Sequence, residues 1–426
     1  MSALPERDGR PPAAPPDTLP GAPATVVVVG GGIGGLATAL AVSRAGHRAV
    51  VLERAPEFAE IGAGIQIAPN GILALERLGL GDAVRAAGVH MAELRFMDGV
   101  TGEHVTSLTL TERYRRRFGN PYVVVHRAEL HGLLLKTCLA DARIDLRAAT
   151  AVTGYRQDGR GATALLAGGG TVAGDALIGA DGIHSAVRAQ LVGDGEPRIS
   201  GITVYRAIVP MERVPEELRL PTSVTWWAGP HCHFVHYPIA GGAFLNLAAS
   251  RDNGATEAIA GVAVGEELVH AQLAGLTAPA ARRLLALGEG WRSWVLVDRD
   301  PVDGWTDGRV ALLGDAAHPM LHYAAQGACQ ALEDAVLLGE LMVQTTELTD
   351  TLERFAAERH ARTAAIQRAA RESVRLWHPA GEDATARNKL LGGLSEDELH
   401  EHVAWMHDIR PFPSMDHHNY DGEPWA

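Results

Sequence analysis

The residues TVVVVGGGIGGLATALAV, from Thr25 to Val42, decide how this chain folds. They are uncharged and about as long as the ~18 residues that a membrane helix needs. However, a β-branched run followed by five glycines in six positions breaks a single helix into strand, turn and helix. Gly30, Gly32 and Gly35 have the GxGxxG spacing, which permits a tight turn and brings N–H groups of the helix N-terminus to a pyrophosphate. The stretch therefore predicts a dinucleotide-binding unit and no membrane span.

The residues that follow complete this unit. The segment RAVVLER, residues 48–54, predicts a second strand ending at Glu53, whose carboxylate is placed to accept a hydrogen bond from an adenosine ribose hydroxyl. Arg54, directly after it, belongs to the expected cofactor contacts. A glycine-rich turn that only lets the helix pack on the sheet is the competing interpretation. Strand, glycines, helix, strand and acid within about 30 residues favour dinucleotide binding.

Two later segments repeat the order of strand, turn and helix. ALIGADGIHSAVR, residues 176–188, places Asp181 at such a turn. RVALLGDAAHPM, residues 309–320, ends its strand near Asp315, and a long helix is predicted over 326–342. An acid at the end of a strand can accept hydrogen bonds from polyol hydroxyls, while the dipole of the following helix faces an anion. This pairing suits the ribityl chain and the reduced ring of a flavin.

The composition excludes several classes of protein. With 426 residues the chain is long enough for two domains, and its net charge of −13 argues against a nucleic-acid partner. Cys138, Cys232 and Cys329 form no CxxC pair, so neither a disulfide framework nor a zinc ribbon is indicated. We therefore expect a protein of the reducing cytoplasm with no metal centre and no membrane contact. A homodimer is compatible with the sequence, although no motif indicates one.

The motifs GGGIGG, GADGIHSAVR and GDAAHPM, in this order and at these separations, resemble those of the single-component FAD-dependent aromatic monooxygenases. The resemblance covers residues 25–375. The segments PYVVVHRAEL, VYRAIVP, GPHCHFVHYPI and LLGDAAHPMLHYAAQGACQALEDA are most similar to the 3-hydroxybenzoate 6-hydroxylase and salicylate hydroxylase group. This likeness implies FAD as cofactor, NADH or NADPH and O₂ as co-substrates, and hydroxylation of a small phenolic acid by OH transfer from a flavin C4a-hydroperoxide.

The residues alone leave other functions open. A hydroxylase that modifies a larger aromatic compound in secondary metabolism would have the same motifs. A flavin reductase or dehydrogenase that never transfers oxygen would have the same dinucleotide-binding unit, and so would a nucleotide-binding module without catalysis. Oxygen uptake with an oxygenated product distinguishes the hydroxylases from the reductases, and a colourless purified protein would favour the module.

The resemblance also implies an α/β fold, in which a Rossmann-like FAD-binding domain of the glutathione-reductase type carries an inserted antiparallel sheet. Short extended runs separated by turn residues over 196–250 agree with such a sheet, which would roof a substrate pocket. The predicted parts are a disordered proline-rich tail (1–24), a discontinuous FAD-binding domain (25–195 and 292–375), a substrate domain (196–291, joined by part of 90–120) and a helical or irregular C-terminal extension (376–426). We expect a helix near 385–408, and the extension either covers the pocket mouth or forms a subunit contact.

The matching positions of the family motifs imply a set of FAD contacts. From the adenosine end to the flavin ring they are the glycine turn with Glu53, Arg127 at the phosphates, Asp181, which is also implicated in NAD(P)H binding, Asp315 at the pyrophosphate and ribityl chain, and the backbone of Gln326, Gly327 and Ala328 at the isoalloxazine ring. Two of them have ordinary alternatives, since Arg127 could be a solvated surface charge and Asp181 could cap the following helix. Glu333 and Asp334 are expected to face solvent or to brace their helix.

The stretch HCHFVHYP, residues 231–238, concentrates titratable groups on a predicted strand of the substrate sheet. A period of two puts His231, His233, Val235 and Tyr237 on one face, and Cys232, Phe234, His236 and Pro238 on the other, away from the chemistry. The resemblance implies that a phenol loses its proton here. His233, with a pKa near neutrality, and Tyr237 as a relay beside it are the candidates.

Several alternatives compete with this assignment. His322, in the segment PMLHYAAQG, should reach the same pocket and could be the base instead. A purely structural strand with packed histidines is also open. A metal site would need a third ligand and an open position, and neither an HExxH motif nor a carboxylate lies nearby in the sequence. Arg206 pairs either with a substrate carboxylate or with a structural partner.

Overall fold

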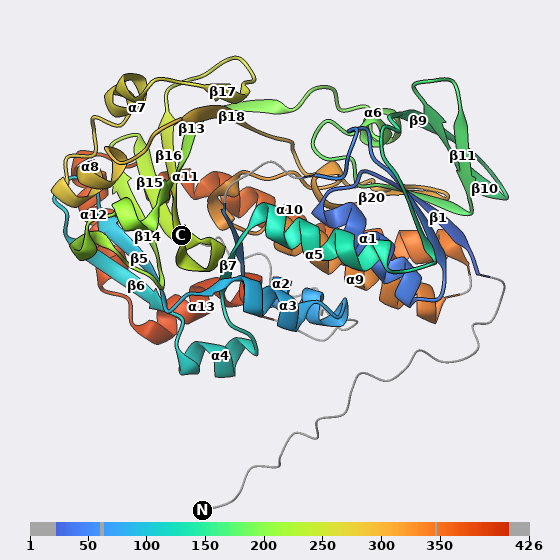
Figure 1. Cartoon of the computed structure of the whole chain (residues 1–426), viewed down its shortest axis with the longest axis horizontal. Helices are drawn as coiled ribbons and strands as arrows, with labels where there is room; N and C mark the ends of the chain where they lie inside the picture. Colours follow the sequence, from blue (N-terminus) through green and yellow to red (C-terminus); the bar gives the residue numbers. More distant parts are fainter. Residues whose placement is uncertain (1–22, 60–63, 346, 409–426) are drawn as a thin grey trace, which may run out of the picture.

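The computed structural model describes residues 23–59, 64–345 and 347–408. Nearly all of the predicted proline-rich tail and the end of the C-terminal extension lie outside the described residues. Figure 1 shows two parts that each contain a large sheet and lie side by side along the long axis of the molecule. The site described below lies where these two parts meet.

The first part is built around the strand that precedes the glycines. β1 (Thr25–Val29) lies inside a six-stranded sheet of order β19-β20-β12-β1-β2-β8 and pairs in parallel with β2 (Arg48–Leu52) and β12 (Ala176–Gly179). Its valines are buried, as expected for a parallel strand covered on both faces. Helix α1 (Ile33–Arg44) follows the glycines and packs against α9 (Gly327–Gln344). The predicted strand, turn, helix and second strand are therefore confirmed.

The second part is an eight-stranded sheet of order β17-β18-β13-β16-β15-β14-β5-β6. Its strands are β5 (Glu93–Asp98), β6 (His104–Thr109), β13 (Arg198–Pro210), β14 (Ser223–Gly229), β15 (Cys232–Ile239), β16 (Phe244–Asp252), β17 (Ala260–Ala263) and β18 (Arg292–Asp298). The antiparallel sheet expected over 196–250 is present, and strands from 93–109 join it as expected. The boundary at residue 291 is wrong, however, because β18 satisfies the hydrogen bonds along the free edge of β13 and so belongs to this sheet.

The remaining elements connect and cover these two sheets. They are the strands β3 (Gly64–Ile67), β4 (Val89–His90), β7 (Val123–His126), β9 (Val152–Asp158), β10 (Gly161–Leu166) and β11 (Thr171–Gly174), and the helices α2 (Pro69–Arg77), α3 (Gly81–Ala87), α4 (Glu112–Phe118), α5 (Arg127–Leu139), α6 (Ala186–Leu191), α7 (Glu266–Gln272), α8 (Pro279–Leu285), α10 (Leu348–Glu372), α11 (Val374–Trp377), α12 (Gly381–Gly392) and α13 (Glu396–His407). The six-stranded sheet itself is completed by β8 (Ile144–Arg147), β19 (Thr306–Asp307) and β20 (Val310–Leu312). Within the described ranges, no helix combines the length and the apolar character that crossing a membrane requires.

The C-terminal extension folds back onto the eight-stranded sheet. The single helix expected near 385–408 is in fact two helices, because α12 ends at the glycines 392–393 and Ser395 starts α13 with a reciprocal capping box to Glu398. Helix α12 contacts β6, and α13 contacts β6 and α4. The extension is therefore packed against the β6 edge of the eight-stranded sheet.

A buried ionic network connects helices α9 and α10 to the loop that follows β20. Glu333 and Asp334 bind the guanidinium of Arg359, and Glu333 also binds that of Arg362. Asp334 accepts a hydrogen bond from the Gly314 N–H at 3.0 Å and interacts with the imidazole of His318 at 2.7 Å. Burial opposes ionisation of both carboxyls, but the neighbouring positive charges prevail and lower the pKa of each to about 2. Of the two expectations for these acids, bracing of the helix is observed and solvent exposure is not.

We expect the change Asp334→Ala to lower the free energy of unfolding by about 3–5 kcal/mol, since it removes one of the two carboxylates that bind the buried guanidinium of Arg359 and the partner of buried His318. Urea unfolding monitored by circular dichroism measures the loss. The change Glu358→Gln removes an exposed partner of Arg354 and should cost less than about 1 kcal/mol. Equal losses in the two variants would contradict a dominant role for the buried network.

The same network predicts a pH dependence of stability. Because the pKa values of Glu333 and Asp334 are lower in the folded protein than in the unfolded chain, their contribution is fully present above about pH 4. It should be lost progressively as the pH falls from about 4 towards 2, where the folded carboxyls take up protons. Unfolding free energies measured between pH 6 and 3 in wild type and Asp334→Ala should converge on acidification.

Candidate active site

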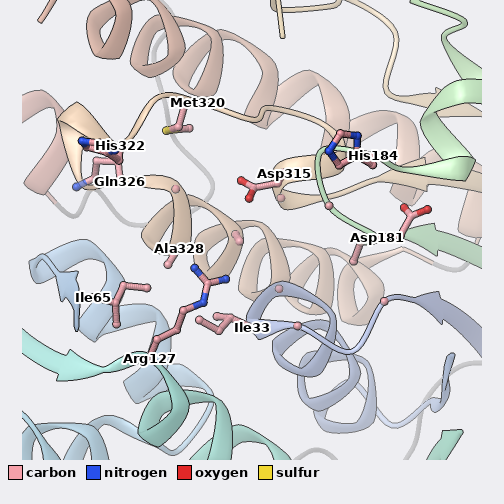
Figure 2. Close-up of a pocket in the computed structure, with 18 of the residues that line it drawn as sticks. Ile33, Ile65, Arg127, Asp181, His184, Asp315, Met320, His322, Gln326 and Ala328 are labelled. Atoms are coloured by element: carbon pink, nitrogen blue, oxygen red, sulfur yellow. The ribbon is translucent and has the colours of Figure 1, made fainter. Parts of the chain in front are cut away.

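A cavity of about 580 Å³ lies between the glycine turn, the start of α9 and the eight-stranded sheet. Figure 2 shows Ile33, Arg127, Asp315 and Ala328 around it. The predicted site residues that line it are Gly30, Gly32, Glu53, Arg54, Arg127, Asp181, His233, Tyr237, Asp315, His322, Gln326, Gly327 and Ala328. Gly35 does not line the cavity, because it lies one turn into α1. The fold thus brings together segments that are nearly 300 residues apart along the chain.

The glycine turn has no room for side chains. Gly30 has a φ of +106°, and a Cβ on it would lie 2.4 Å from the carbonyl oxygen of Ala180. A Cβ on Gly35 would lie 1.9 Å from the carbonyl oxygen of Gly30, so this glycine lets α1 begin directly on the turn. No side chain caps the N-terminus of α1, and its first turn contains no acid. Its first N–H groups are therefore available to a pyrophosphate, and the cradle fits a dinucleotide.

Glu53 holds the glycine turn from the neighbouring strand. Its carboxylate accepts hydrogen bonds from the N–H of Gly31 at 2.7 Å and from the N–H of Ala55 at 2.8 Å. Helix α5 contacts the same turn, because Nε2 of its buried residue His131 lies 2.8 Å from the carbonyl oxygen of Gly31. The sequence did not single out His131, since an isolated histidine on a helix gives no signal of its contact with a distant loop.

The start of α9 forms a second uncapped helix end at the same cavity. No side chain caps it and its first turn contains no acid, so the N–H groups after Gln326 face the cavity as the first N–H groups of α1 do. The side chain of Gln326 is itself buried and accepts hydrogen bonds from Asn70 and Gln330, each at 2.9 Å. The exposed carboxylate of Asp315 points towards the space between the two helix ends (Figure 2). Two positive helix ends and one carboxylate suit the phosphates, polyol and ring of FAD.

Asp181 caps a helix, which was the alternative considered from the sequence. Its carboxylate accepts hydrogen bonds from the N–H groups of Ala186 and Val187 at the start of α6, at 2.8 and 3.4 Å. Burial raises its pKa, although the hydrogen bonds from Ser185 and the helix oppose that shift. The side chain therefore caps a helix, and a contribution to cofactor binding would come from the turn that it fixes.

A row of residues across the eight-stranded sheet forms the opposite wall of the cavity. Trp226 pairs with Val235, Val235 with Ala248, and Ala248 with Arg206, so all four lie at one level on the same face. Asn246 lies in the next row beside Tyr237, and its buried Oδ1 has no hydrogen-bond partner among the described residues. Asn246 was missed because one asparagine in the run FLNLAAS does not indicate a site.

Arg206 is the cation in this wall. Its buried Nε has no hydrogen-bond partner within the described ranges, and no carboxylate there forms an ion pair with it. Its guanidinium carbon lies 5.6 Å from the ring centroid of Trp294. The structural ion pair considered from the sequence is therefore not formed. Burial lowers the pKa of Arg206, so an anion that enters the cavity would stabilise its charged form.

His233 and Tyr237 lie on the cavity face of β15, but they do not form the expected relay. Four residues along a strand separate their Cα atoms by about 13 Å. The hydroxyl of Tyr237 donates to the carbonyl oxygen of Gly64 at 3.0 Å, while Nδ1 of His233 lies 2.9 Å from Nε2 of His378. His231 is not on this face, because β15 begins at Cys232 and the exposed His231 has a φ of +56° in the preceding turn.

The expectation of a histidine with a near-neutral pKa is wrong for both candidate bases. Burial, and then the unfavourable interaction that a charged His233 would have with the imidazoles of His378 and His322, lower the pKa of His233 well below its usual value. Burial and the charge of Arg206 lower the pKa of His322 to about 3. Both rings are therefore neutral and able to accept a proton only when a negative charge forms beside them.

The other face of β15 points away from the cavity, as the alternation predicts. Cys232 and His236 are buried and do not line the cavity. Burial raises the pKa of the Cys232 thiol to about 11 and lowers that of His236 to about 3. Throughout the described residues, the histidine, cysteine and acidic side chains form no group of three that could hold a metal ion.

The C-terminal extension contributes to the cavity wall, which agrees with the first of its two expected roles, although the sequence did not indicate which residue reaches the pocket. Trp377 lines the cavity, and its ring lies 5.5 Å from that of Trp226. His378 follows it and contacts His233. The segment LWHPAG carries no motif, and only the fold shows that it reaches the pocket.

Comparisons with known proteins agree with this site. Residues 23–370 match the family model described as FAD binding domain. The chain is 44% identical over 383 residues to 3-hydroxybenzoate 6-hydroxylase 1 of Aquipseudomonas alcaligenes, covering 90% of this chain and 97% of the relative. It is 36% identical over 395 residues to 3-amino-4-hydroxybenzoate 2-monooxygenase PtnB3 of Streptomyces platensis, covering 91% and 96%. Among solved structures, Klebsiella pneumoniae HpxO complexed with FAD and uric acid superimposes with a TM-score of 0.77 at 27% identity, covering 88% of this chain and 95% of that one.

We expect the change Gly30→Ala to abolish FAD binding, because the new Cβ requires a disfavoured φ and meets the backbone of Ala180. The absorbance of purified protein at the flavin bands measures the bound fraction. In the matched control Gly132→Ala, the Cβ on α5 meets no atom within 4 Å, so FAD content should not change. A yellow Gly30→Ala protein with normal FAD content would contradict the assigned turn.

Proposed function

The chain belongs to the FAD-binding-domain family and is an FAD-dependent aromatic monooxygenase, and from this premise we propose that it hydroxylates a monohydroxybenzoate of the 3-hydroxybenzoate type. The observation that carries the substrate assignment is Arg206, a cation in the cavity wall without an ion-pair partner in the described residues. Burying such a charge is costly unless an anion joins it. A benzoate carboxylate supplies that anion, and the named relatives act on hydroxybenzoates.

Bound FAD supplies the oxidation chemistry, since it accepts two electrons from NADH or NADPH and activates O₂. The residues that would hold it are the glycine turn, Glu53, Arg54, Arg127, Asp181, Asp315 and the backbone of Gln326, Gly327 and Ala328. Held by these residues, the cofactor would lie along the wall of the cavity that faces the row of residues on the sheet. We propose that the substrate ring lies between the two walls.

The sheet residues orient that ring. Arg206 binds the carboxylate of the substrate. The hydroxyl of Tyr237 lies near enough to the guanidinium of Arg206 for each of these two side chains to affect the pKa of the other. Trp226 and Trp377 enclose the ring on the side of the C-terminal extension and exclude water. His233 then faces the phenol with Nε2, because its Nδ1 is turned towards His378.

Deprotonation of the phenol makes the ring carbon more nucleophilic. The low pKa values of His233 and His322 do not prevent this step, because a phenolate beside either ring stabilises its protonated form. Proton transfer to His233 therefore occurs together with substrate binding. His322 is the second candidate for the base, and Tyr237 lines the same wall with its hydroxyl bound to the carbonyl oxygen of Gly64.

The cellular setting is proposed on separate grounds. The three cysteines are buried free thiols, which suits the reducing cytoplasm. A homodimer stays a prediction, and sedimentation equilibrium would test it.

The reaction is tested by measuring NADH and NADPH oxidation, O₂ uptake and product formation with a panel of aromatic acids. We expect stoichiometric O₂ uptake and a dihydroxybenzoate product with 3-hydroxybenzoate, and weaker coupling with salicylate, 3-amino-4-hydroxybenzoate and aminophenols. Reduction of FAD with only hydrogen peroxide as product, for every member of the panel, would contradict the proposed hydroxylation.

We expect the change Arg206→Gln to raise KM for 3-hydroxybenzoate on the order of 30-fold or more, because a charge-assisted pair is worth about 2 kcal/mol or more. The KM for 3-hydroxybenzyl alcohol, which lacks the carboxylate, should change little. The control Arg292→Gln changes an exposed arginine on β18 that pairs in register with residue 206. A similar rise in KM for both substrates would argue against carboxylate recognition by Arg206.

A further inference from the structure

The C-terminal extension contributes a histidine that is connected to the proposed base but does not itself line the cavity. The segment is fixed at this place by three contacts. Trp377 stacks on Phe96 with ring centroids 5.0 Å apart, and the N–H of His231 donates to the carbonyl oxygen of His378 at 2.9 Å. The third contact joins the imidazole of His378 to that of His233 at 2.9 Å. Both imidazoles are buried, with 6% and 2% of the residues exposed.

This contact determines which nitrogen of His233 is available to a substrate. Nδ1 of His233 is engaged with Nε2 of His378, so Nε2 of His233 is the nitrogen that can accept a proton from the cavity. The hydroxyl of Tyr323 also approaches Nε2 of His378, at 3.4 Å, from the loop that carries His322. Two groups from distant segments, the imidazole of His233 and the hydroxyl of Tyr323, therefore meet at the imidazole of His378.

The other nitrogen of His378 is engaged by neither His233 nor Tyr323. Its Nδ1 is buried and has no hydrogen-bond partner among the residues that the structure describes. The side chain of His231, in the turn before β15, is exposed and lies close enough for its charge to affect His378. Burial, and then the positive charges of His231 and Arg251, lower the pKa of His378 to about 4, so this ring is neutral and can carry a proton only transiently.

We propose that His378 positions His233 and forms the second member of a proton relay that takes the phenolic proton from the cavity to solvent. The inference rests on the proposed hydroxylation of a phenol. The O–H bond of the substrate breaks as an N–H bond forms at Nε2 of His233. The proton on Nδ1 of His233 moves to Nε2 of His378, and the proton on Nδ1 of His378 leaves to water near His231. Transfer in the reverse direction restores both tautomers when the product leaves.

The enclosure of the site gives a reason for such a relay. Trp226 and Trp377 close the cavity beside His233, so bulk water does not reach the phenol on this side. A proton that stayed on buried His233 would cost free energy, because the ring has lost its hydration. A second imidazole on the outward side lets the charge move to a less buried position.

The change His378→Ala tests the relay, with His407→Gln as the matched control. His407 is a similarly buried histidine of the same extension, but its Nδ1 interacts with Tyr114 at 2.8 Å, and it does not line the cavity. The direct readout needs no turnover: stopped-flow absorbance follows formation of the phenolate when 3-hydroxy-4-nitrobenzoate binds to the oxidised, FAD-containing enzyme. We expect phenolate formation to slow on the order of tenfold or more in His378→Ala and to be unchanged in His407→Gln.

Three further measurements separate a relay from a structural role. In His378→Ala, kcat for the hydroxylation should fall on the order of tenfold, while KM and the FAD content stay within about twofold of wild type. Added imidazole should restore the rate of phenolate formation, because it can occupy the space left by the side chain. An unchanged rate of phenolate formation in His378→Ala would overturn the relay. So would a slowed rate that added imidazole does not restore, if KM is raised as well. If the wild-type enzyme binds the nitro analogue as its phenolate and yet forms no hydroxylated product from 3-hydroxybenzoate, the proposed function fails, whereas the relay stands.

Discussion

The buried interaction of Asp334 with Arg359 and His318 is the constraint on which the arrangement of the site depends. Removing such charges from water is expensive, and only a complete set of partners compensates for it. Here the partners come from α9, α10 and the loop after β20, so the three segments have one favourable arrangement. Arg362 extends the network to α13, since its guanidinium binds Glu333 and donates to the carbonyl oxygens of Trp405 and Met406. The start of α9 and the loop after β20, which line the cavity, are thereby held together with the C-terminal extension by one set of charges.

The opposite wall depends on register rather than on charge. In an antiparallel sheet, residues that pair across strands share a face, and a shift of one residue would turn all of them over. The pairing of Val235 with Ala248 and of Ala248 with Arg206 therefore brings the arginine to the cavity face at the level between His233 and Tyr237. Small side chains at 235 and 248 leave the space that a planar ring needs. The wall thus combines a cation, an asparagine and two tryptophans around an apolar centre.

The sequence predicted those features that depend on local pattern. The glycine spacing predicted the turn and the helix end, and the period of two in HCHFVHYP predicted which side chains face the cavity. The pairing of His233 with His378 was not predictable, since it joins residues 145 apart whose proximity depends on the fold of α11. The low pKa values of the histidines were also missed, because burial is a property of the closed cavity and not of the strand. Likewise, β18 was assigned to the wrong part, because it pairs with β13, a strand that is far from it along the chain.

Enclosure and proton transfer are connected in this cavity. The tryptophans that exclude water make the site suitable for holding an activated oxygen, but they also remove the solvent that would otherwise accept the phenolic proton. The segment that contributes Trp377 to the wall contributes His378 directly after it, on the outer side of His233. The residue that closes the site and the residue that can conduct a proton out of it therefore move together with one short helix. The wall of the cavity and the imidazole contact therefore depend on the same placement of α11.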